Sequence, residues 1–323
     1  MKPISNLLPL LFLAACDAGS DLAKSDTQGH SCSIELIVLG IGQDAGAPQI
    51  GYRNDPAWAN PGLRLLPTSI AIVDHNTSER ILFEATPSVT HQLQMLDEMS
   101  KPSERSLGID GVFLTHAHIG HYAGLIYFGH EAAGASKIPV YAMPRFKDYL
   151  SANGPWDQLV ELENISLSTL ANQNSVSPIG SVKVTPFQVP HRDEYSETVG
   201  YQIETAGKTV FFLPDIDSWE EWETDFKIKI EDIVSHVDYA FLDASFFDDN
   251  ELPGRDMSKI PHPRVVGSMD RLQHLSDIDR AGVHFIHMNH SNPIRFENSD
   301  ETKSVRARGF SIAREGQRHC LVE

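Results

Sequence analysis

Apolar residues along this chain gather in short runs and in helically spaced sets, and the pattern predicts an order of strands and helices. The segments 34–40, 69–75 and 80–86 are apolar runs of strand length, which is typical of buried strands. The polar residues at 76–78 separate the last two segments and predict a hairpin. Residues 89–99 carry apolar side chains at helical spacing, so a helix is expected there.

The rest of the chain continues this succession. Strands are expected at 111–116, 137–143, 181–190, 238–246 and 283–290, hairpins at 198–215 and 309–322, and helices at 122–133, 219–235 and 265–278. Because the strands occur in two series that are each followed by helices, we expect two central sheets with helices on their outer faces. No repeat or second linker interrupts the pattern, so one domain is predicted from residue 32 to residue 323.

The first residues differ from the remainder and predict an export signal. Lys2 precedes an apolar stretch at 7–15 that is too short to span a bilayer. The small residues before Cys16 resemble the bacterial lipobox, in which the signal is cut before a cysteine that then carries lipids. This resemblance predicts a signal peptide at 1–15 and lipidation of Cys16, and the alternative is an ordinary cleaved signal with an incidental cysteine. Asp17 resembles an inner-membrane retention signal of Gram-negative lipoproteins.

An exported, lipid-anchored protein would face the periplasm from the inner membrane. Residues 16–31 begin with the lipidated cysteine and continue as a polar, aperiodic segment, which predicts a flexible tether. Cys32 and Cys320 stand near the two ends of the predicted domain, and an oxidising compartment permits a disulfide between them. Two unpaired buried thiols are the alternative, because the sequence does not give the distance between the two residues.

The composition fits a folded domain and argues against one class of partner. The chain has 323 residues, of which 41% are hydrophobic and 22% are charged, so it can bury a sizeable core. Its formal net charge is −18, whereas nucleic-acid phosphates require a basic surface. We therefore expect a small-molecule substrate rather than nucleic acid.

Three histidines follow the predicted strand at 111–116 within six positions. His116 and His118 are two residues apart in extended chain, so their side chains point the same way. The chain then turns toward a helix, where His121 can face the same cavity. Neutral imidazole is a ligand for zinc and iron. The alternative is a set of surface or helix-capping histidines, but three in an H-x-H-x-x-H arrangement after an apolar strand favour a metal site.

The stretch THAHIGH (115–121) resembles the metallo-β-lactamase superfamily motif T-H-x-H-x-D-H, and the order of predicted elements fits that family's fold. The resemblance implies an α/β (α+β) fold, a four-layer αββα sandwich. It also implies that later strand ends contribute to the same site. The residues at those strand ends are His191 in VPH, Asp215 in FFLPD, and His287 and His290 in HFIHMNH.

Glycine stands at position 120, where the superfamily motif has aspartate. By resemblance, His116, His118 and His191 would hold one metal, and Asp215 would bridge to a second. The second site would keep only His121, Asp215 and His287, with Asp44 and His290 as possible substitutes for the lost carboxylate. We therefore expect zinc, with one firm site and a second that is weak or absent, and iron or manganese as other metals that suit these ligands.

Within the superfamily, the chain is most similar to the B protein of pyrroloquinoline quinone (PQQ) biosynthesis. The similar segments are VLGIGQDAGAPQ (38–49), FLDASFFDDNE (241–251) and FIHMNHSNP (285–293). That family has a cysteine-rich, zinc-binding segment after its first glycine-rich loop, whereas this chain has GYRNDPAW (51–58) without cysteine. The structural zinc is therefore expected to be absent.

These residues predict metal-assisted chemistry. A metal lowers the pKa of bound water to about 7 and polarises a carbonyl or phosphoryl oxygen. Asp215 would orient the nucleophile, and Glu194 and His262 would contact substrate or donate a proton. The first hypothesis is a lipid-anchored hydrolase of an ester, amide, lactone or phosphodiester. The alternatives are an iron oxygenase like the PQQ B protein, and a binding lipoprotein with a degenerate second metal site.

Overall fold

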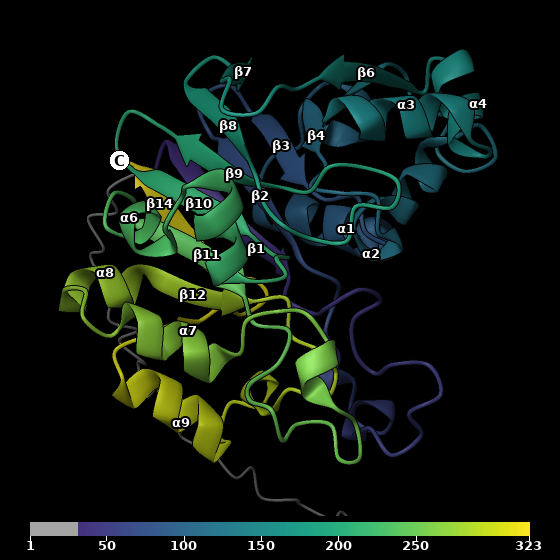
Figure 1. The fold of residues 1–323 in the computed structure, drawn as a ribbon. Helices are drawn as coiled ribbons and strands as arrows, with labels where there is room; N and C mark the ends of the chain where they lie inside the picture. Colours follow the sequence, from purple (N-terminus) through teal and green to yellow (C-terminus); the bar gives the residue numbers. More distant parts are fainter. Residues whose placement is uncertain (1–31) are drawn as a thin grey trace, which may run out of the picture. The chain divides into compact units, whose positions relative to one another are not determined.

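The computed structural model describes residues 32–323. The predicted signal peptide at 1–15, Cys16 and the predicted tether at 16–31 lie outside the described residues. The described part contains two seven-stranded sheets that pack face to face, with helices on both outer sides (Figure 1). Within residues 32–323, no helix is both long enough and apolar enough to cross a membrane.

The first sheet has the strand order β14-β1-β2-β3-β4-β5-β6. Its strands are β1 (Ile34–Gly40), β2 (Ser69–Asp74), β3 (Glu79–Phe83), β4 (Gly111–Phe113), β5 (Ile138–Ala142), β6 (Ile165–Thr169) and β14 (Arg318–Val322). The helices that follow these strands are α1 (Val89–Met99), α2 (Ile119–Tyr122), α3 (Pro144–Ala152) and α4 (Trp156–Glu161). Strand β1 is buried on both faces, since Leu36 joins the core between the sheets and Ile37 packs with the helices.

The second sheet has the order β13-β12-β11-β10-β9-β8-β7. Its strands are β7 (Val176–Ile179), β8 (Val182–Gln188), β9 (Val199–Glu204), β10 (Thr209–Leu213), β11 (Tyr239–Asp243), β12 (Val283–Ile286) and β13 (Ser311–Ile312). The helices are α5 (Trp219–Glu221), α6 (Ile230–Val234), α7 (Val265–Leu272), α8 (Asp277–Gly282) and α9 (Asp300–Ala307). Side chains from α5, α6, α7 and α9 belong to the same core cluster as this sheet.

Several predicted elements are confirmed. The helix at 89–99 is α1, and β2 pairs with β3 as an antiparallel hairpin. The predicted hairpin at 198–215 is formed by β9 and β10. Two sheets with helices outside, predicted from the two series of strands, are also confirmed.

The hairpin predicted at 309–322 is wrong. β13 pairs in parallel with β12 in the second sheet, whereas β14 pairs antiparallel with β1 in the first sheet. The turn at Glu315 and Gly316 therefore carries the chain from one sheet to the other. The Glu315 carboxylate accepts a hydrogen bond of 2.6 Å from the backbone N–H of Leu66, which fixes this crossing. A polar turn between two apolar segments does not specify which strands they join.

Three predicted helices are too long. The helix expected to reach residue 133 consists of α2 and a 3-10 segment that ends at Phe128. The helix expected at 219–235 is interrupted at Lys227, whose φ of 61° is left-handed. The helix expected at 265–278 is divided into α7 and α8, and Ser276 caps the second.

A disulfide joins Cys32 to Cys320, with their Cα atoms 5.6 Å apart. It lies beside the pairing of β1 with β14, the strands nearest the two ends of the described chain. The sequence left two unpaired thiols as the alternative, and the structure has the bonded form. The bond links residues 288 positions apart, so it restricts the unfolded chain over nearly the whole domain.

We predict that Cys320→Ser lowers the free energy of unfolding by about 2–4 kcal/mol, because the unfolded chain gains freedom when the crosslink is lost. Denaturant unfolding under non-reducing conditions measures this change. Cys32→Ser should produce the same loss, and the double variant should lose no more than either single one, since all three remove the same bond. Equal unfolding midpoints for wild type and variants would contradict the prediction.

Candidate metal centre

Strand ends from both sheets meet at one edge of the sandwich. β10, β11 and β12 run parallel, so their carboxyl ends lie at the same edge of the second sheet. The segment after β4 reaches this edge from the first sheet. The side chains delivered there are His116, His118 and His121 after β4, His191 after β8, Asp215 after β10 and His287 after β12.

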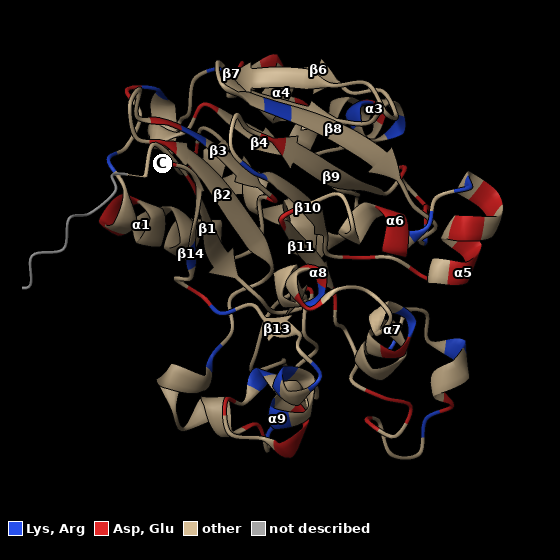
Figure 2. Ribbon diagram, turned by 90° about the vertical axis from the view of Figure 1, so that its left-hand side faces the viewer, with Lys and Arg blue, Asp and Glu red and all other residues tan. Residues whose placement is uncertain are grey.

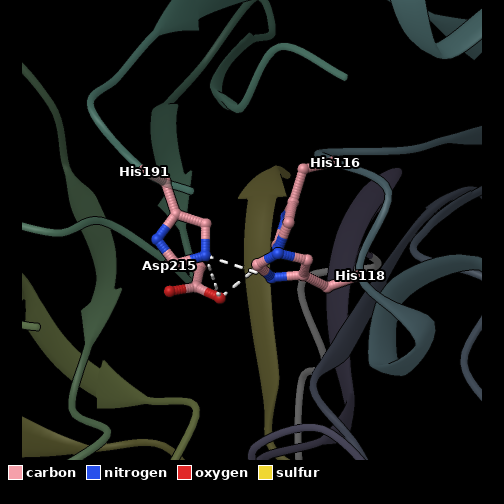
Figure 3. A group of neighbouring side chains, drawn as sticks. All are labelled: His116, His118, His191 and Asp215. Carbon is pink, nitrogen blue, oxygen red and sulfur yellow. Dashed lines mark hydrogen bonds and ion pairs between the residues drawn. The ribbon is translucent and has the colours of Figure 1, made fainter. Parts of the chain in front are cut away.

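One group of side chains surrounds the carboxylate of Asp215 (Figure 3). Asp215 Oδ2 lies 3.4 Å from His116 Nε2 and 3.3 Å from His191 Nε2. His118 completes the group, with its Nδ1 3.2 Å from His191 Nε2. Each of the four residues places one ligand atom within 4.8 Å of the others. Three imidazole nitrogens and a carboxylate oxygen at such spacing suit a single four-coordinate metal ion.

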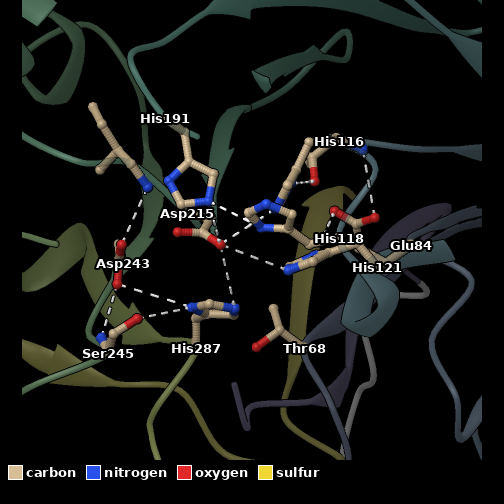
Figure 4. A network of polar contacts seen from close by, with 12 residues as sticks. Thr68, Glu84, His116, His118, His121, His191, Asp215, Asp243, Ser245 and His287 are labelled. Atoms are coloured by element: carbon tan, nitrogen blue, oxygen red, sulfur yellow. Dashed lines mark hydrogen bonds and ion pairs between the residues drawn. The ribbon is translucent and has the colours of Figure 1, made fainter. Parts of the chain in front are cut away.

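A second group shares Asp215 and adds His121 and His287 (Figure 4). Asp215 Oδ2 lies 3.8 Å from His121 Nε2 and 3.9 Å from His287 Nε2. All three side chains are buried. Asp215 therefore stands between the two groups, which is the bridging position expected from the sequence.

Most ring nitrogens that face away from Asp215 have a partner of their own. Such outer partners hold the orientation in which the inner nitrogen can bind a metal. They are Thr115 Oγ1 for His116 (2.9 Å), the Asp217 carboxylate for His191 (2.7 Å), Ser245 Oγ for His287 (3.0 Å) and the Glu84 carboxylate for His121 (3.4 Å). For His118 the outer nitrogen is Nε2, which lies 3.4 Å from the Glu194 carboxylate.

Asp243 and His262 form a third group with Asp215. His262 Nδ1 lies 2.8 Å from Asp243 Oδ2 and 3.2 Å from Asp215 Oδ1, and its side chain is 6% exposed. Asp243 is fully buried, and it accepts hydrogen bonds from the backbone N–H groups of Ile216 and Ser245. The sequence argument missed Asp243. Its signal was the same as that of Asp215, a carboxylate at the end of an apolar strand.

Burial and neighbouring charges shift the pKa values of the centre in different directions. Burial, followed by the neighbouring His121, holds the pKa of His116 well below its usual value. Burial alone would lower the pKa of His191, but the carboxylates of Asp215 and Asp217 raise it to about 9. Burial would also raise the pKa of Asp215, yet the nearby histidine charges hold it well below normal. His191 would have to lose its proton to act as a metal ligand.

Gly120 is required by a close approach of the 42–46 loop. A Cβ atom at position 120 would lie 2.5 Å from Cα and 2.7 Å from O of Asp44. Both atoms are backbone, so a small rotamer change would not relieve the clash. The backbone of Asp44 thus occupies the space into which an aspartate side chain would extend. The missing carboxylate of the motif reflects this packing, and the Asp44 carboxylate itself is not in any of the three ligand groups.

Two predicted site residues lie apart from the ligand groups of the described chain. The ring of His290 packs edge-on against Tyr52, with ring centroids 5.0 Å apart, and His290 belongs to none of the groups. His287 rather than His290 is therefore the histidine of this strand end that faces Asp215. Glu194 is 53% exposed beside His118, which places it at the outer side of the centre.

The three segments that resemble the PQQ B protein interlock around His287. Asn289 donates from its backbone N–H to Ser245 O and from its side chain to Gln43 Oε1. Met288 exchanges backbone hydrogen bonds with the 38–49 segment. Asn292 donates to Ala244 O at 2.7 Å. These contacts fix the 42–46 loop and the β12 end together, which places Asp44 against Gly120 and His287 against Asp215.

Residues 79–318 match the family described as Beta-lactamase superfamily domain. The chain belongs to this superfamily. It has the metallo-β-lactamase fold, as expected from the THAHIGH motif. Coenzyme PQQ synthesis protein B of Methylorubrum extorquens is 27% identical over 312 residues, which cover 88% of this chain and 98% of the relative. The protein of the same name from Rhizobium meliloti is 27% identical over 308 residues, which cover 88% of this chain and 96% of the relative.

Solved structures agree on the fold. Zn2+-bound PqqB from Methylobacterium extorquens superimposes with a TM-score of 0.73 at 23% identity, covering 88% of this chain and 99% of that one. A diphosphatase of the PhnP family gives a TM-score of 0.62 at 21% identity, and the match covers 88% of this chain and 96% of that one. At these identities the similarity establishes the architecture of this member of the superfamily and leaves its activity to be argued from the site.

We predict that Gly120→Asp, which restores the superfamily motif, destabilises the protein by about 1–3 kcal/mol through overpacking against Asp44. Thermal or denaturant unfolding measures the loss. Gly267→Asp is the matched control, because a Cβ at that exposed helix position meets nothing within 4 Å, and its effect should stay within about 0.5 kcal/mol. A stable Gly120→Asp protein that binds additional metal would contradict this account of the glycine.

Proposed function

We propose that the protein is a metal-dependent hydrolase that acts on a small molecule. The observation that carries the proposal is a set of buried ligand atoms that converge without hydrogen-bond partners. His116 Nε2, His121 Nε2 and His287 Nε2 are all buried and lack such a partner, as does Asp215 Oδ1. Unpaired buried polar atoms are costly in a folded protein. A cation at the centre satisfies them, so the residues fit a metal.

His116, His118, His191 and Asp215 would hold the first ion. When bound, the metal supplies a water of lowered pKa and a positive charge that polarises the oxygen of the scissile group. Asp215 fixes the position of the centre, because its carboxylate faces ligand nitrogens from both sheets. Glu194 stands at the exposed side next to His118, where it can contact a substrate. An ester, amide, lactone or phosphodiester fits this chemistry.

The surroundings favour a small substrate over nucleic acid. An open cleft of ≈ 460 Å³ adjoins the centre at Asp217 and His262. Its other side is formed by α5, which carries Glu220 and Glu221, and acidic residues mark this helix in Figure 2. The cleft is lined by four carboxylates, with Asp217 and Asp249 as the other two, against the cations Lys259 and Arg264, and this negative balance disfavours a polyanion. The net charge of −18 acts in the same direction.

A second candidate function is an iron-dependent oxygenase. The group His121, Asp215 and His287 contains two imidazoles and one carboxylate, the ligand set used by non-haem Fe(II) oxygenases. Similarity to coenzyme PQQ synthesis protein B over most of the chain makes this candidate relevant. The oxygenase differs from the hydrolase in its requirement for ferrous iron and oxygen.

One experiment separates the two candidates. Protein purified without added metal is analysed for metal content, stripped, and reloaded separately with Zn2+, Mn2+ or Fe2+. Each form is assayed on ester, lactone, lactam and phosphodiester panels and for oxygen consumption. Turnover with zinc or manganese and no oxygen uptake supports the hydrolase. Oxygen consumption with ferrous iron alone supports the oxygenase, and a loaded protein without either activity points to a binding protein.

We predict that His118→Ala abolishes retention of the first ion and lowers metal-dependent turnover by at least about 100-fold, because one of three imidazole ligands is lost. Metal analysis after dialysis and initial rates check this outcome. His91→Ala, an exposed histidine of α1, is the matched control and should leave both unchanged. Unchanged metal stoichiometry in His118→Ala would show that the ligand assignment is wrong.

We also propose that the protein is exported and anchored by lipids on Cys16 in the inner membrane, facing the periplasm. The disulfide between Cys32 and Cys320 supports an oxidising compartment.

We predict that Cys16→Ala shifts the protein from the membrane fraction to the soluble periplasmic fraction, since the lipid chains are its only proposed anchor. Fractionation with a lipid label tests this. Membrane association of the unlabelled Cys16→Ala protein would argue against the anchor.

A further inference from the structure

Asp243 and His262 are not needed by either ligand set that the superfamily motif implies. His262 Nδ1 nonetheless lies 3.2 Å from Asp215 Oδ1, and Asp243 offers a carboxylate oxygen within 4.8 Å of ligand atoms of both residues. Asp215 is 3% exposed, and its Oδ1 is buried without a hydrogen-bond partner. A buried carboxylate oxygen that faces a second carboxylate and an imidazole requires a positive charge between them.

These atoms lie closer together than ligands around one ion, and the contact between His262 and Asp243 has the length of a hydrogen bond. Four ligands at about 2.1 Å from a tetrahedral metal lie about 3.4 Å from one another. His262 Nδ1 is 2.8 Å from Asp243 Oδ2 and 3.2 Å from Asp215 Oδ1. In the group expected from the superfamily, His121 and His287 are 3.8 and 3.9 Å from Asp215 Oδ2. The third group is therefore the more compact of the two.

The charges of the ligands also favour the third group, which consists of Asp215, Asp243 and His262. Two carboxylates, Asp215 and Asp243, balance a divalent cation, whereas the group of His121 and His287 offers only the shared Asp215. The carboxylate that would have completed that group is missing at Gly120, and the Asp44 backbone fills its space. Carboxylate-rich sites also suit harder cations such as Mn2+ and Fe2+.

His262 is held in a strained backbone conformation. His262 has a φ of 101°, a conformation that non-glycine residues rarely adopt. Its backbone N–H donates to Asp217 O at 3.1 Å, and its carbonyl accepts from Arg264 Nη1 at 2.7 Å. Arg264 also donates to Met257 O and Ile260 O, so it ties the whole 257–264 loop. A strained, multiply tied residue indicates that the position of its ring matters.

We propose that Asp215, Asp243 and His262 form a second cation site, displaced from the position that the superfamily motif implies. Asp215 would contribute to both sites, because its Oδ2 faces the ligand nitrogens of the first group and its Oδ1 faces His262. This inference rests on the proposed metal-dependent function for the first ion, but it is measured by metal content.

The test compares metal stoichiometry in full-length variants after equilibrium dialysis against Zn2+ and, separately, Mn2+. Wild type should bind two ions, whereas Asp243→Asn and His262→Gln should each bind one. His121→Ala, which alters only the group expected from the superfamily, should keep two. His91→Gln is the matched exposed-histidine control and should also keep two. Circular dichroism and unfolding midpoints confirm that each variant is folded.

Three results would overturn the proposal. The first is a single ion in wild type at saturating metal. The second is loss of the second ion in His121→Ala together with its retention in His262→Gln. The third is an unchanged two-ion stoichiometry in His262→Gln with an altered pH dependence of turnover, which would make His262 a proton donor. Absence of turnover on every substrate, with these stoichiometries as expected, would reject the hydrolase and leave the cation site standing.

Discussion

The buried carboxylate of Asp215 is the constraint on which the rest of the centre depends. An ionised carboxylate removed from water is tolerated only when positive charge or hydrogen-bond donors compensate it. In this protein the compensation comes from histidine rings on three strand ends and one loop, and Asp215 itself accepts no backbone hydrogen bond that would satisfy its Oδ1. The pKa values of His191 and His262 are raised beside this carboxylate, whereas burial holds that of His116 well below normal, so the rings combine positive charge with neutral nitrogens that can bind a cation. The same arrangement thus explains both the folded stability of the centre and its capacity for metal.

The two-sheet architecture makes such a concentration of ligands possible. Strands that run parallel end at the same edge, and each end can present one or two side chains without disturbing the ladder. Outer partners such as Asp217 and Ser245 follow the ends of other strands of the same sheet, β10 for His191 of β8 and β11 for His287 of β12. Orientation of the rings is therefore a property of the strand ends themselves. The 42–46 loop packs beside these strand ends and occupies the space beside Gly120.

Carboxylate charge at the centre comes from Asp215 and Asp243 and not from position 120. At Gly120 the backbone of Asp44 fills the space of the motif carboxylate, whereas Asp243 is buried beside His262, which contacts Asp215. The open cleft adjoins His262, so the charge of this pair lies beside the space that a substrate can enter.

The sequence alone predicted the local features α1 and the hairpin of β2 and β3, which follow from periodicity and are local properties of the chain. The grouping of His116, His118, His191 and Asp215 was predicted through the resemblance of THAHIGH and the later strand ends to the superfamily motif, and the structure brings the four side chains together. Tertiary structure decided what depends on partners far away in sequence. β13 and β14 belong to different sheets, Gly120 is dictated by Asp44, and Asp243 faces His262. Such contacts are set by packing between segments that no local pattern connects, so only the folded chain reveals them.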